Sequence, residues 1–334
     1  MFSGCQTIGS MAMDGKKGEQ IGIRCDPEWK KLVERLAAQE RRKSSDFIRL
    51  PERVYDRRTM FLTLQIETTA LCSARCTFCV YPAAGPGRGL RHMDRALFEK
   101  IVDEAAGAGV FTAYVLNGLG EPTLDPQLEE RVRYVSESDP DAAVKIYTHG
   151  AHLTPRRLDR LRDAGLGEVC ISLNAVRADQ HERVTGLRNA FDRVCANAEY
   201  AIAHRGRMTV RVHAVFNSDF PRPDMEWFYA RWGHWQHGGH GLVAYEGNWG
   251  GERPTEREID PASPCWRALE TVYVLADGRV SACCFDPLAT LCFGDLKTQT
   301  LGEVYSSEAY VAFRKRHADG QADAYPICAK CTRI

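Results

Sequence analysis

From residue 61 to residue 246, short apolar runs alternate with longer amphipathic segments. Six runs have the length and composition of β-strands: Phe61–Glu67, Phe111–Asn117, Val144–Thr148, Glu168–Asn174, Met208–Phe216 and Leu242–Glu246. Five segments between them have helical periodicity: Asp94–Ala106, Pro126–Ser138, Thr154–Ala164, Phe191–His204 and Asp224–Trp235. Such alternation predicts right-handed βαβ units around a parallel sheet. We therefore expect an α/β fold, a partial TIM-like (β/α)6 barrel whose chemistry lies at the C-terminal ends of its strands.

The regions on either side of the alternating segment differ from it. Residues 1–58 are polar and charged, with one amphipathic helix around Trp29, Leu32 and Leu36 that is expected to pack against the main body. After about residue 254 the chain is rich in cysteine, and an Asp277-Gly278 turn lies between the short runs 272–275 and 280–284, which predicts a β-hairpin. A helix is expected at 301–317. We thus expect a helical extension (1–58), a barrel (59–254) and a small hairpin-plus-helix domain (255–334).

Charge and hydropathy exclude several kinds of partner. The 334-residue chain has 44 Lys plus Arg and 44 Asp plus Glu, so its net charge does not favour nucleic acid. No run approaches the roughly 20 apolar residues that span a bilayer, and the first residues lack a signal-peptide pattern. No nucleic-acid or membrane partner is expected, and the expected location is cytoplasmic. Thirteen cysteines in such a compartment favour metal binding over disulfides.

Three cysteines lie on the loop after the first predicted strand, at Cys72, Cys76 and Cys79. Three thiolates on one short loop can bind three irons of a cubane cluster and leave the fourth iron open to a chelating substrate. A structural zinc site would need a fourth ligand, and His92 is the nearest candidate. The spacing and the location favour the cluster.

This Cys-x3-Cys-x-aromatic-Cys motif after the first strand of a partial barrel resembles the radical S-adenosylmethionine (SAM) superfamily. The resemblance implies a [4Fe–4S] cluster that binds SAM and cleaves it reductively to a 5′-deoxyadenosyl radical. It also implies an electron donor such as flavodoxin or ferredoxin. Phe78 matches the aromatic residue that the family places against adenine.

A second motif, from Asn117 to Pro122, follows the second predicted strand. Gly118 and Gly120 allow backbone to come close to a ligand, and Glu121 offers a carboxylate for an ammonium group. The motif resembles the family's Gly-Gly-Glu-Pro sequence, which implies that it binds the SAM amino group.

The fourth predicted strand has polar residues on one face. Because side chains alternate along a strand, Cys170, Ser172 and Asn174 share that face. The resemblance implies that Ser172 and Asn174 contact the ribose or carboxylate of SAM, whereas hydrogen bonding to neighbouring strands is the plainer alternative.

The C-terminal cysteines form a second group. Cys265, Cys283, Cys328 and Cys331 suit either zinc or an iron–sulfur cluster. Their spacing is similar to the short auxiliary domain called twitch, a relative of the SPASM domain, which implies one auxiliary [4Fe–4S] cluster. Cys284, next to Cys283, leaves that ligand assignment open.

The auxiliary spacing most resembles aminoglycoside-type radical SAM dehydrogenases. This implies abstraction of a hydrogen atom from a small polar substrate, such as a sugar, aminocyclitol or nucleoside, and oxidation of a secondary alcohol, as in antibiotic biosynthesis. Arg211, His213 and Glu246 are the candidate substrate-side groups, with Glu246 as a possible general base. Alternatives are a redox-neutral epimerase, for which Cys170 or Cys284 would donate hydrogen, a decarboxylase, and an enzyme that modifies ribosomal peptides.

Overall fold

The computed structural model describes residues 62–89, 91–217, 219–245, 247, 249 and 265–332. The expected helix near Trp29, the whole segment 1–58 and the candidate base Glu246 lie outside the described residues. The described residues belong to one compact unit.

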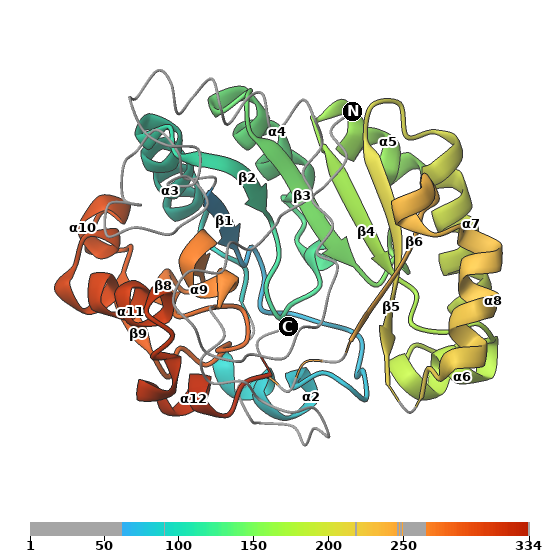
Figure 1. The fold of residues 1–334 in the computed structure, drawn as a ribbon. Helices are drawn as coiled ribbons and strands as arrows, with labels where there is room; N and C mark the ends of the chain where they lie inside the picture. The colour runs from blue at the N-terminus through green and yellow to red at the C-terminus, as the bar shows by residue number, and fades with distance from the viewer. Residues whose placement is uncertain are drawn as a thin grey trace, which may run out of the picture. The chain divides into compact units, whose positions relative to one another are not determined.

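All six expected barrel strands are present (Figure 1). They are β1 (Leu62–Ile66), β2 (Phe111–Val115), β3 (Ala143–Thr148), β4 (Glu168–Ser172), β5 (Thr209–Phe216) and β6 (Gly241–Tyr245). Each pairs in parallel with the next, so the partial (β/α)6 barrel is confirmed.

The five expected barrel helices are also present, and they flank the strands on one side (Figure 1). They are α3 (Arg95–Ala108), α4 (Leu128–Ser138), α5 (Pro155–Asp163), α7 (Phe191–Ala203) and α8 (Arg222–Trp232). Side-chain caps mark two of their starts: Asp94 accepts from the Leu97 amide, and Thr154 from the Arg157 amide. Their buried faces form one core with the outward side chains of the strands, and this core includes Ile101 of α3 and Leu64 of β1.

Several short elements were not expected. Around the barrel these are α2 (Tyr81–Ala84), η2 (Pro86–Arg88), η3 (Pro122–Leu124), α6 (Ala178–Thr185) and η4 (Trp235–His237). The helix α6 closes with Gly186 at φ 70°, a left-handed conformation that suits glycine.

The C-terminal part continues the same sheet. It begins with α9 (Trp266–Glu270) and contains β7 (Thr271–Val274), β8 (Arg279–Ser281) and β9 (Cys292–Asp295). The expected hairpin is formed by β7 and β8, and β7 pairs in parallel with β1. The strand order is therefore β6-β5-β4-β3-β2-β1-β7-β8-β9.

The single helix expected at 301–317 is wrong, because two helices occupy that segment. The first, α10 (Leu301–Tyr305), starts with a capping box between Thr300 and Glu303. The second, α11 (Glu308–Ala318), starts where the Ser307 side chain accepts from the Tyr310 amide. A serine cap thus begins a new helix inside one periodic pattern. Two short turns follow, η6 (Ala322–Ala324) and α12 (Pro326–Ala329).

Within the described residues, no helix has both the length and the apolar character needed to cross a membrane.

Candidate functional site

The three-cysteine loop is held in place from several sides. The Arg75 and Thr77 amides donate to the carbonyls of Thr185 and Val184 at the end of α6 (2.7 and 2.9 Å). The Cys72 amide donates to the Tyr81 hydroxyl (2.8 Å). Three anchors on a loop of eight residues fix the directions of its thiols.

These three thiols need a bound cation if all of them are to be ionised together. The pKa of Cys72 is raised to about 12 by burial and by the charges of Glu121 and Cys79. The pKa of Cys76 is raised by burial and by the neighbouring thiols Cys79 and Cys72. Because each thiolate disfavours the next, a multivalent cation is needed to hold all three ionised.

The donor set itself suits an iron–sulfur cluster. Three cysteine thiolates on one loop can each bind a different iron of a [4Fe–4S] cubane and leave the fourth iron without a protein ligand. A structural zinc site would need a fourth protein ligand.

Glu121 is buried between the ends of β2 and β3. Its Oε1 accepts from the Thr123 amide (3.0 Å) and from the hydroxyls of Thr123 and Thr148 (2.5 and 2.6 Å). Its Oε2 accepts from the His149 amide (2.8 Å), and the His149 ring lies 3.6 Å away. The carboxylate therefore organises the loops around the expected SAM site, and its contact with SAM stays a prediction.

The two glycines of this motif are required by close packing within the protein. A Cβ at Gly118 would lie 2.4 Å from the Tyr273 hydroxyl and 2.7 Å from Glu67 Cβ. A Cβ at Gly120 would lie 2.0 Å from the Thr69 carbonyl oxygen. Both distances are far below van der Waals contact, so a side chain at either position would displace the loop.

The strand β4 ends at Ser172, so the strand alternation does not extend to Asn174 as predicted. Asn174 is buried with φ 54°, its side chain accepts from the Val215 amide (3.0 Å), and its amide group donates to the Ser172 carbonyl (3.4 Å). Asn174 thus ties β4 to β5. Its role toward SAM, and that of Ser172, remain predictions.

Charged side chains gather on the inner face of β3, β4 and β5. Glu168 lies between two cations, 3.4 Å from Lys145 and 3.9 Å from Arg211. Arg211 also lies over the Trp235 ring, 5.4 Å from its centre. His213 pairs in register with Ser172, and burial lowers its pKa to about 4. Arg211 and His213, two of the three candidate substrate-side groups, therefore lie two residues apart on the same face of β5.

The auxiliary cysteines form a second group of interacting thiols. The pKa of Cys283 is raised by burial and by the thiols of Cys284, Cys265 and Cys331. Cys328 lies on α12, and the Cys331 amide donates to its carbonyl (3.3 Å). The four expected ligands thus come from one region, although they are up to 66 residues apart in the sequence.

Cys284 differs from Cys283 in its surroundings. Its pKa is raised by burial, while Arg267 acts in the opposite direction through its charge and a hydrogen bond. The same thiol, together with Cys170 and Glu168, acts on the phenol of Tyr147 at the end of β3. Burial and these charges raise the pKa of Tyr147 to about 12, although its ring is partly open to solvent. The charge of one auxiliary-region thiol therefore acts on a side chain of the barrel.

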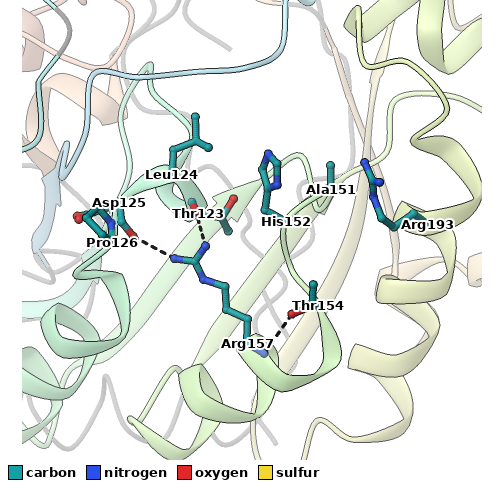
Figure 2. A pocket seen from close by; sticks show the side chains of 9 residues that line it. All are labelled: Thr123, Leu124, Asp125, Pro126, Ala151, His152, Thr154, Arg157 and Arg193. Atoms are coloured by element: carbon teal, nitrogen blue, oxygen red, sulfur yellow. Dashed lines mark hydrogen bonds between the residues drawn. The ribbon is translucent and has the colours of Figure 1, made fainter.

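Two cavities accompany these groups. The first, of about 360 Å³, lies between the cysteine loop and the segment from Phe285 to Thr290, and Cys76 and Cys79 line it. The second, of about 600 Å³, lies over the loops after β2 and β3 (Figure 2). There Arg157 donates to the carbonyls of Thr123 and Asp125, which supports the loop that follows Glu121. Only the first cavity is lined by thiols, so it is the candidate functional site.

Sequence reasoning missed three residues of this region. Glu67 directly follows β1 and is a fully buried carboxylate, and His149 connects Glu121 to Ser73. Trp249 donates to the Phe78 carbonyl (2.9 Å) and packs on Phe285. The sequence contained a local sign of only one of these three residues, because Glu67 is a charged residue directly after an apolar strand.

Family comparisons agree with this arrangement. Residues 66–218 match the family model of the radical SAM superfamily, and residues 265–332 match an iron–sulfur cluster-binding domain of the SPASM type. The protein therefore combines a radical SAM domain with a SPASM-type domain, and its cofactors are SAM and [4Fe–4S] clusters.

Among individual proteins, the chain is similar to the PqqA peptide cyclase of Ruegeria pomeroyi, with 34% identity over 41% of this chain and 35% of that protein. It is also similar to the GTP 3′,8-cyclase of Klebsiella pneumoniae, with 29% identity over 51% of each chain. The matches span between one third and about half of these relatives.

Two solved structures share the fold. BtrN in complex with AdoMet and 2-DOIA superposes with a TM-score of 0.58 and 18% identity, covering 82% of this chain and 93% of that one. Streptococcus suis SuiB bound to the precursor peptide SuiA gives 0.59 and 14%, covering 93% and 79%.

Proposed function

We propose that this protein is a radical SAM dehydrogenase that oxidises a secondary alcohol of a small polar substrate to a ketone. The observation that carries the proposal is the thiol-lined cavity of about 360 Å³. Cys76 and Cys79 line it, and so does the segment from Phe285 to Thr290 that directly follows Cys283 and Cys284. An auxiliary cluster held by Cys283 would stand beside this cavity, where an electron acceptor is needed.

The overall reaction removes two hydrogens from one carbinol group. When bound, SAM and the barrel cluster would supply abstraction of the carbon-bound hydrogen atom, at the cost of one electron from an external donor such as flavodoxin or ferredoxin, and the auxiliary cluster would accept one electron from the substrate. The substrate hydroxyl loses its proton to a base of the protein. The C–O single bond then becomes a C=O bond, and atoms and charges balance.

The inner-face residues have roles that fit a polyhydroxylated or aminated substrate. Lys145, Glu168 and Arg211 form a row of alternating charges across β3, β4 and β5, and Arg211 is the member proposed to orient hydroxyl and amino groups. Burial lowers the pKa of His213 to about 4, so its ring is neutral at pH 7 and can hydrogen-bond a substrate hydroxyl. So low a pKa makes the ring a weak base, and Glu246 stays the proposed acceptor of the hydroxyl proton. Contact of Phe78, Gly118, Gly120, Glu121, Ser172 and Asn174 with SAM is part of the same proposal.

The likeness in fold to one solved structure suggests which small substrates to test first. BtrN, whose solved complex contains AdoMet and 2-DOIA, is covered over 93% of its length. This likeness concerns the fold, and it makes aminocyclitols and amino sugars the first substrates to test.

Peptide modification is the second candidate function. It is favoured by the identity of 34% to a PqqA peptide cyclase over 137 residues. A peptide substrate would enter over the same inner face and use the same thiol-lined cavity.

One experiment separates these functions. The anaerobic protein with both clusters is incubated with SAM, reductant and either aminocyclitols and amino sugars or precursor peptides, and products are analysed by mass. Dehydrogenation gives a small-molecule product lighter by about two mass units, with the abstracted hydrogen in 5′-deoxyadenosine. Incorporation of solvent deuterium without oxidation would instead establish a redox-neutral epimerase, and loss of about 44 mass units a decarboxylase. Modified peptide alone would establish the second candidate. A variant with alanine at Cys72, Cys76 and Cys79 is the matched control, since it lacks the barrel cluster.

A further inference from the structure

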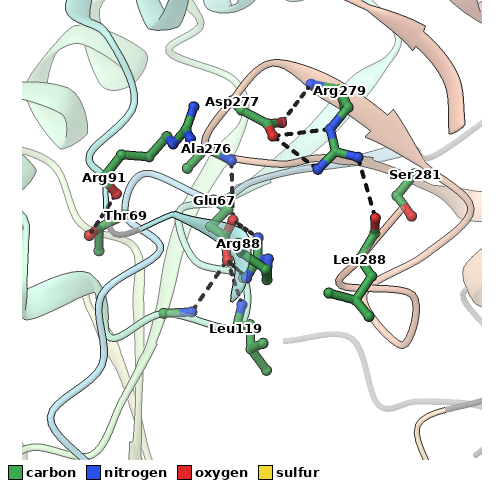
Figure 3. A network of polar contacts seen from close by, with 12 residues as sticks. Glu67, Thr69, Arg88, Arg91, Leu119, Ala276, Asp277, Arg279, Ser281 and Leu288 are labelled. Carbon is green, nitrogen blue, oxygen red and sulfur yellow. Dashed lines mark hydrogen bonds and ion pairs between the residues drawn. The ribbon is translucent and has the colours of Figure 1, made fainter. Parts of the chain in front are cut away.

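One buried carboxylate connects the two halves of the candidate site. Glu67, at the end of β1, is 0% exposed. Its Oε1 accepts from the amides of Leu119 and Gly120 (3.0 and 3.4 Å). Its Oε2 accepts from the Ala276 amide in the hairpin turn (3.1 Å). Figure 3 shows these contacts converging on the Glu67 side chain.

Arg88 completes the contacts of this carboxylate. Both terminal nitrogens of its guanidinium donate to Glu67, one to each oxygen. The Arg88 side chain is only 5% exposed, so the pair is well shielded from water. A bidentate ion pair of this kind fixes orientation as well as charge. The segment after Cys79 is thereby tied to the same point.

Tyr273 fills the space beside Glu67. It lies on β7, it is fully buried, and its hydroxyl has no hydrogen-bond partner. That hydroxyl packs against the Gly118 backbone, and the ring packs in a cluster that includes Cys284. One side chain therefore contacts both the motif of β2 and a thiol of the auxiliary region.

The hairpin turn that carries Ala276 is itself rigid. The Gly278 amide donates to the Leu275 carbonyl (2.9 Å), which makes Ala276 the second residue of a β-turn. Asp277 accepts from Arg279 (3.0 Å), and Arg279 donates to the Leu288 carbonyl (3.3 Å). A turn held in this way has little freedom relative to Cys283, five residues after Gly278.

We propose that Glu67 is a positioning residue that holds the backbone of the Gly118–Glu121 loop and the auxiliary hairpin at a fixed separation, and so couples SAM binding to the auxiliary cluster. Oε1 fixes the loop that is expected to bind SAM, and Oε2 fixes the turn that leads to the auxiliary cysteines. A displacement of the loop is transmitted to the hairpin turn through the Glu67 carboxylate. The inference needs both clusters, but it does not depend on the dehydrogenase proposal, because its test uses no substrate.

The structure offers a sharp test in Ala276→Pro. Proline suits the second position of a β-turn, and it removes the one amide hydrogen that Ala276 gives to Glu67. Ala276→Ser is the matched control, because it keeps that amide and changes the side chain by one hydroxyl group. Glu67→Gln is the second variant, since it removes the charge at nearly constant volume.

The measurements are made on anaerobic protein with both clusters, after iron content and thermal unfolding show that each variant is folded. SAM affinity and the EPR spectrum of the reduced auxiliary cluster are recorded with and without SAM. In the parent protein and in Ala276→Ser, SAM should change the auxiliary signal. In Ala276→Pro that response should disappear while SAM affinity stays within about twofold, because the contacts of Leu119 and Gly120 remain. In Glu67→Gln, SAM affinity should fall at least about tenfold.

Three outcomes would overturn the inference. They are an auxiliary signal that does not respond to SAM in the parent protein, a full response in Ala276→Pro, and unchanged SAM affinity in a folded Glu67→Gln variant. Failure to oxidise any small substrate would refute the proposed reaction and leave this result untouched.

Discussion

Glu121 has both carboxylate oxygens occupied by donors from Thr123, Thr148 and His149. A buried carboxylate is tolerated only when it is hydrogen-bonded in this way. Its position after β2 therefore serves two purposes, since it organises the loop and presents negative charge near the three-cysteine loop, where it acts on Cys72. A hydrogen bond to a charged group contributes about 1.5–3 kcal/mol.

We expect Glu121→Ala to weaken SAM binding by roughly tenfold to a hundredfold, in keeping with that range. Iron content should be unchanged, because Glu121 is not a ligand of iron. Affinity is measured from the change that SAM causes in the EPR signal of the reduced barrel cluster. Glu130→Ala, an exposed position on α4, is the control. SAM affinity equal to that of the control would refute the assignment.

His181 is a second residue whose surroundings predict a measurable effect. It is 0% exposed, it packs on Phe191, and neither ring nitrogen has a hydrogen-bond partner of normal geometry. Burial, with a smaller contribution from His149, lowers its pKa to about 4, against a weak opposing contact with the Leu187 backbone. The folded protein therefore holds the ring neutral, whereas the unfolded chain binds a proton near pH 6.5.

The sign of the pH effect follows from proton binding. Between about pH 6.5 and pH 4 the unfolded state binds more protons, so the free energy of unfolding falls as the pH falls. We expect His181→Phe to remove this contribution, which is of the order of 3 kcal/mol when fully developed. Denaturant unfolding of both proteins at pH 7.5 and pH 6 should show a smaller loss for the variant. An equal loss in both proteins would contradict the prediction.

At the scale of the elements, residues of β7 and residues that follow β1 and β2 pack tightly against one another, with no free space between them. Gly118 is enclosed by Tyr273 and Glu67, so Gly118→Ala should overpack this junction. Overpacking costs about 1–3 kcal/mol, and we expect a matching loss of stability together with weaker SAM binding. The measurement is denaturant unfolding alongside SAM affinity. Adding Tyr273→Phe removes the hydroxyl 2.4 Å from the new methyl group and should restore part of the loss. Loss without any restoration would show that Glu67 alone sets the limit.

The elements that sequence predicted share one property: their pattern is local. The barrel strands have apolar residues on the helix-covered face, as Val169 and Ile171 do on β4, and two of the long helices, α3 and α5, start with side-chain caps. The helix α6 was missed because its buried side carries Gln180 and His181, which conceal the apolar period. The break between α10 and α11 was missed because serine inside a periodic segment is usually tolerated as a surface residue.

The parts of the candidate site also differ in whether the sequence could predict them. The cysteine loop and the glycine motif were predictable because each is contiguous in sequence. The contact between Glu67 and Ala276 joins residues 209 positions apart, and no local pattern encodes it. The position of Trp249 between Phe78 and Phe285 likewise depends on how the chain returns to the barrel.

At the scale of the whole molecule, two groups of cysteines predict two clusters. We expect anaerobically reconstituted protein to contain about eight irons and eight sulfides, four of each per cluster. Alanine at Cys72, Cys76 and Cys79 should leave only the auxiliary cluster, which is about half the iron, and should abolish SAM cleavage. Alanine at Cys328 and Cys331 should leave only the barrel cluster, which is the other half. Iron and sulfide assays with EPR provide the measurement. Stoichiometric zinc in place of the second cluster, in protein purified without oxygen, would refute the auxiliary assignment.

The parallel pairing of β1 with β7 has a consequence for how the chain is made. Thr63 pairs with Thr271, so among the residues that the structure describes β1 finds its partner on that side only after the ribosome has added more than 200 further residues. Until then β1 is the edge of an open sheet, with unpaired amides and carbonyls that attract other strands. A chain truncated after β6 would keep that edge permanently. It should therefore aggregate during expression even though every residue of its three-cysteine loop is present, and cluster insertion is best attempted on the complete chain.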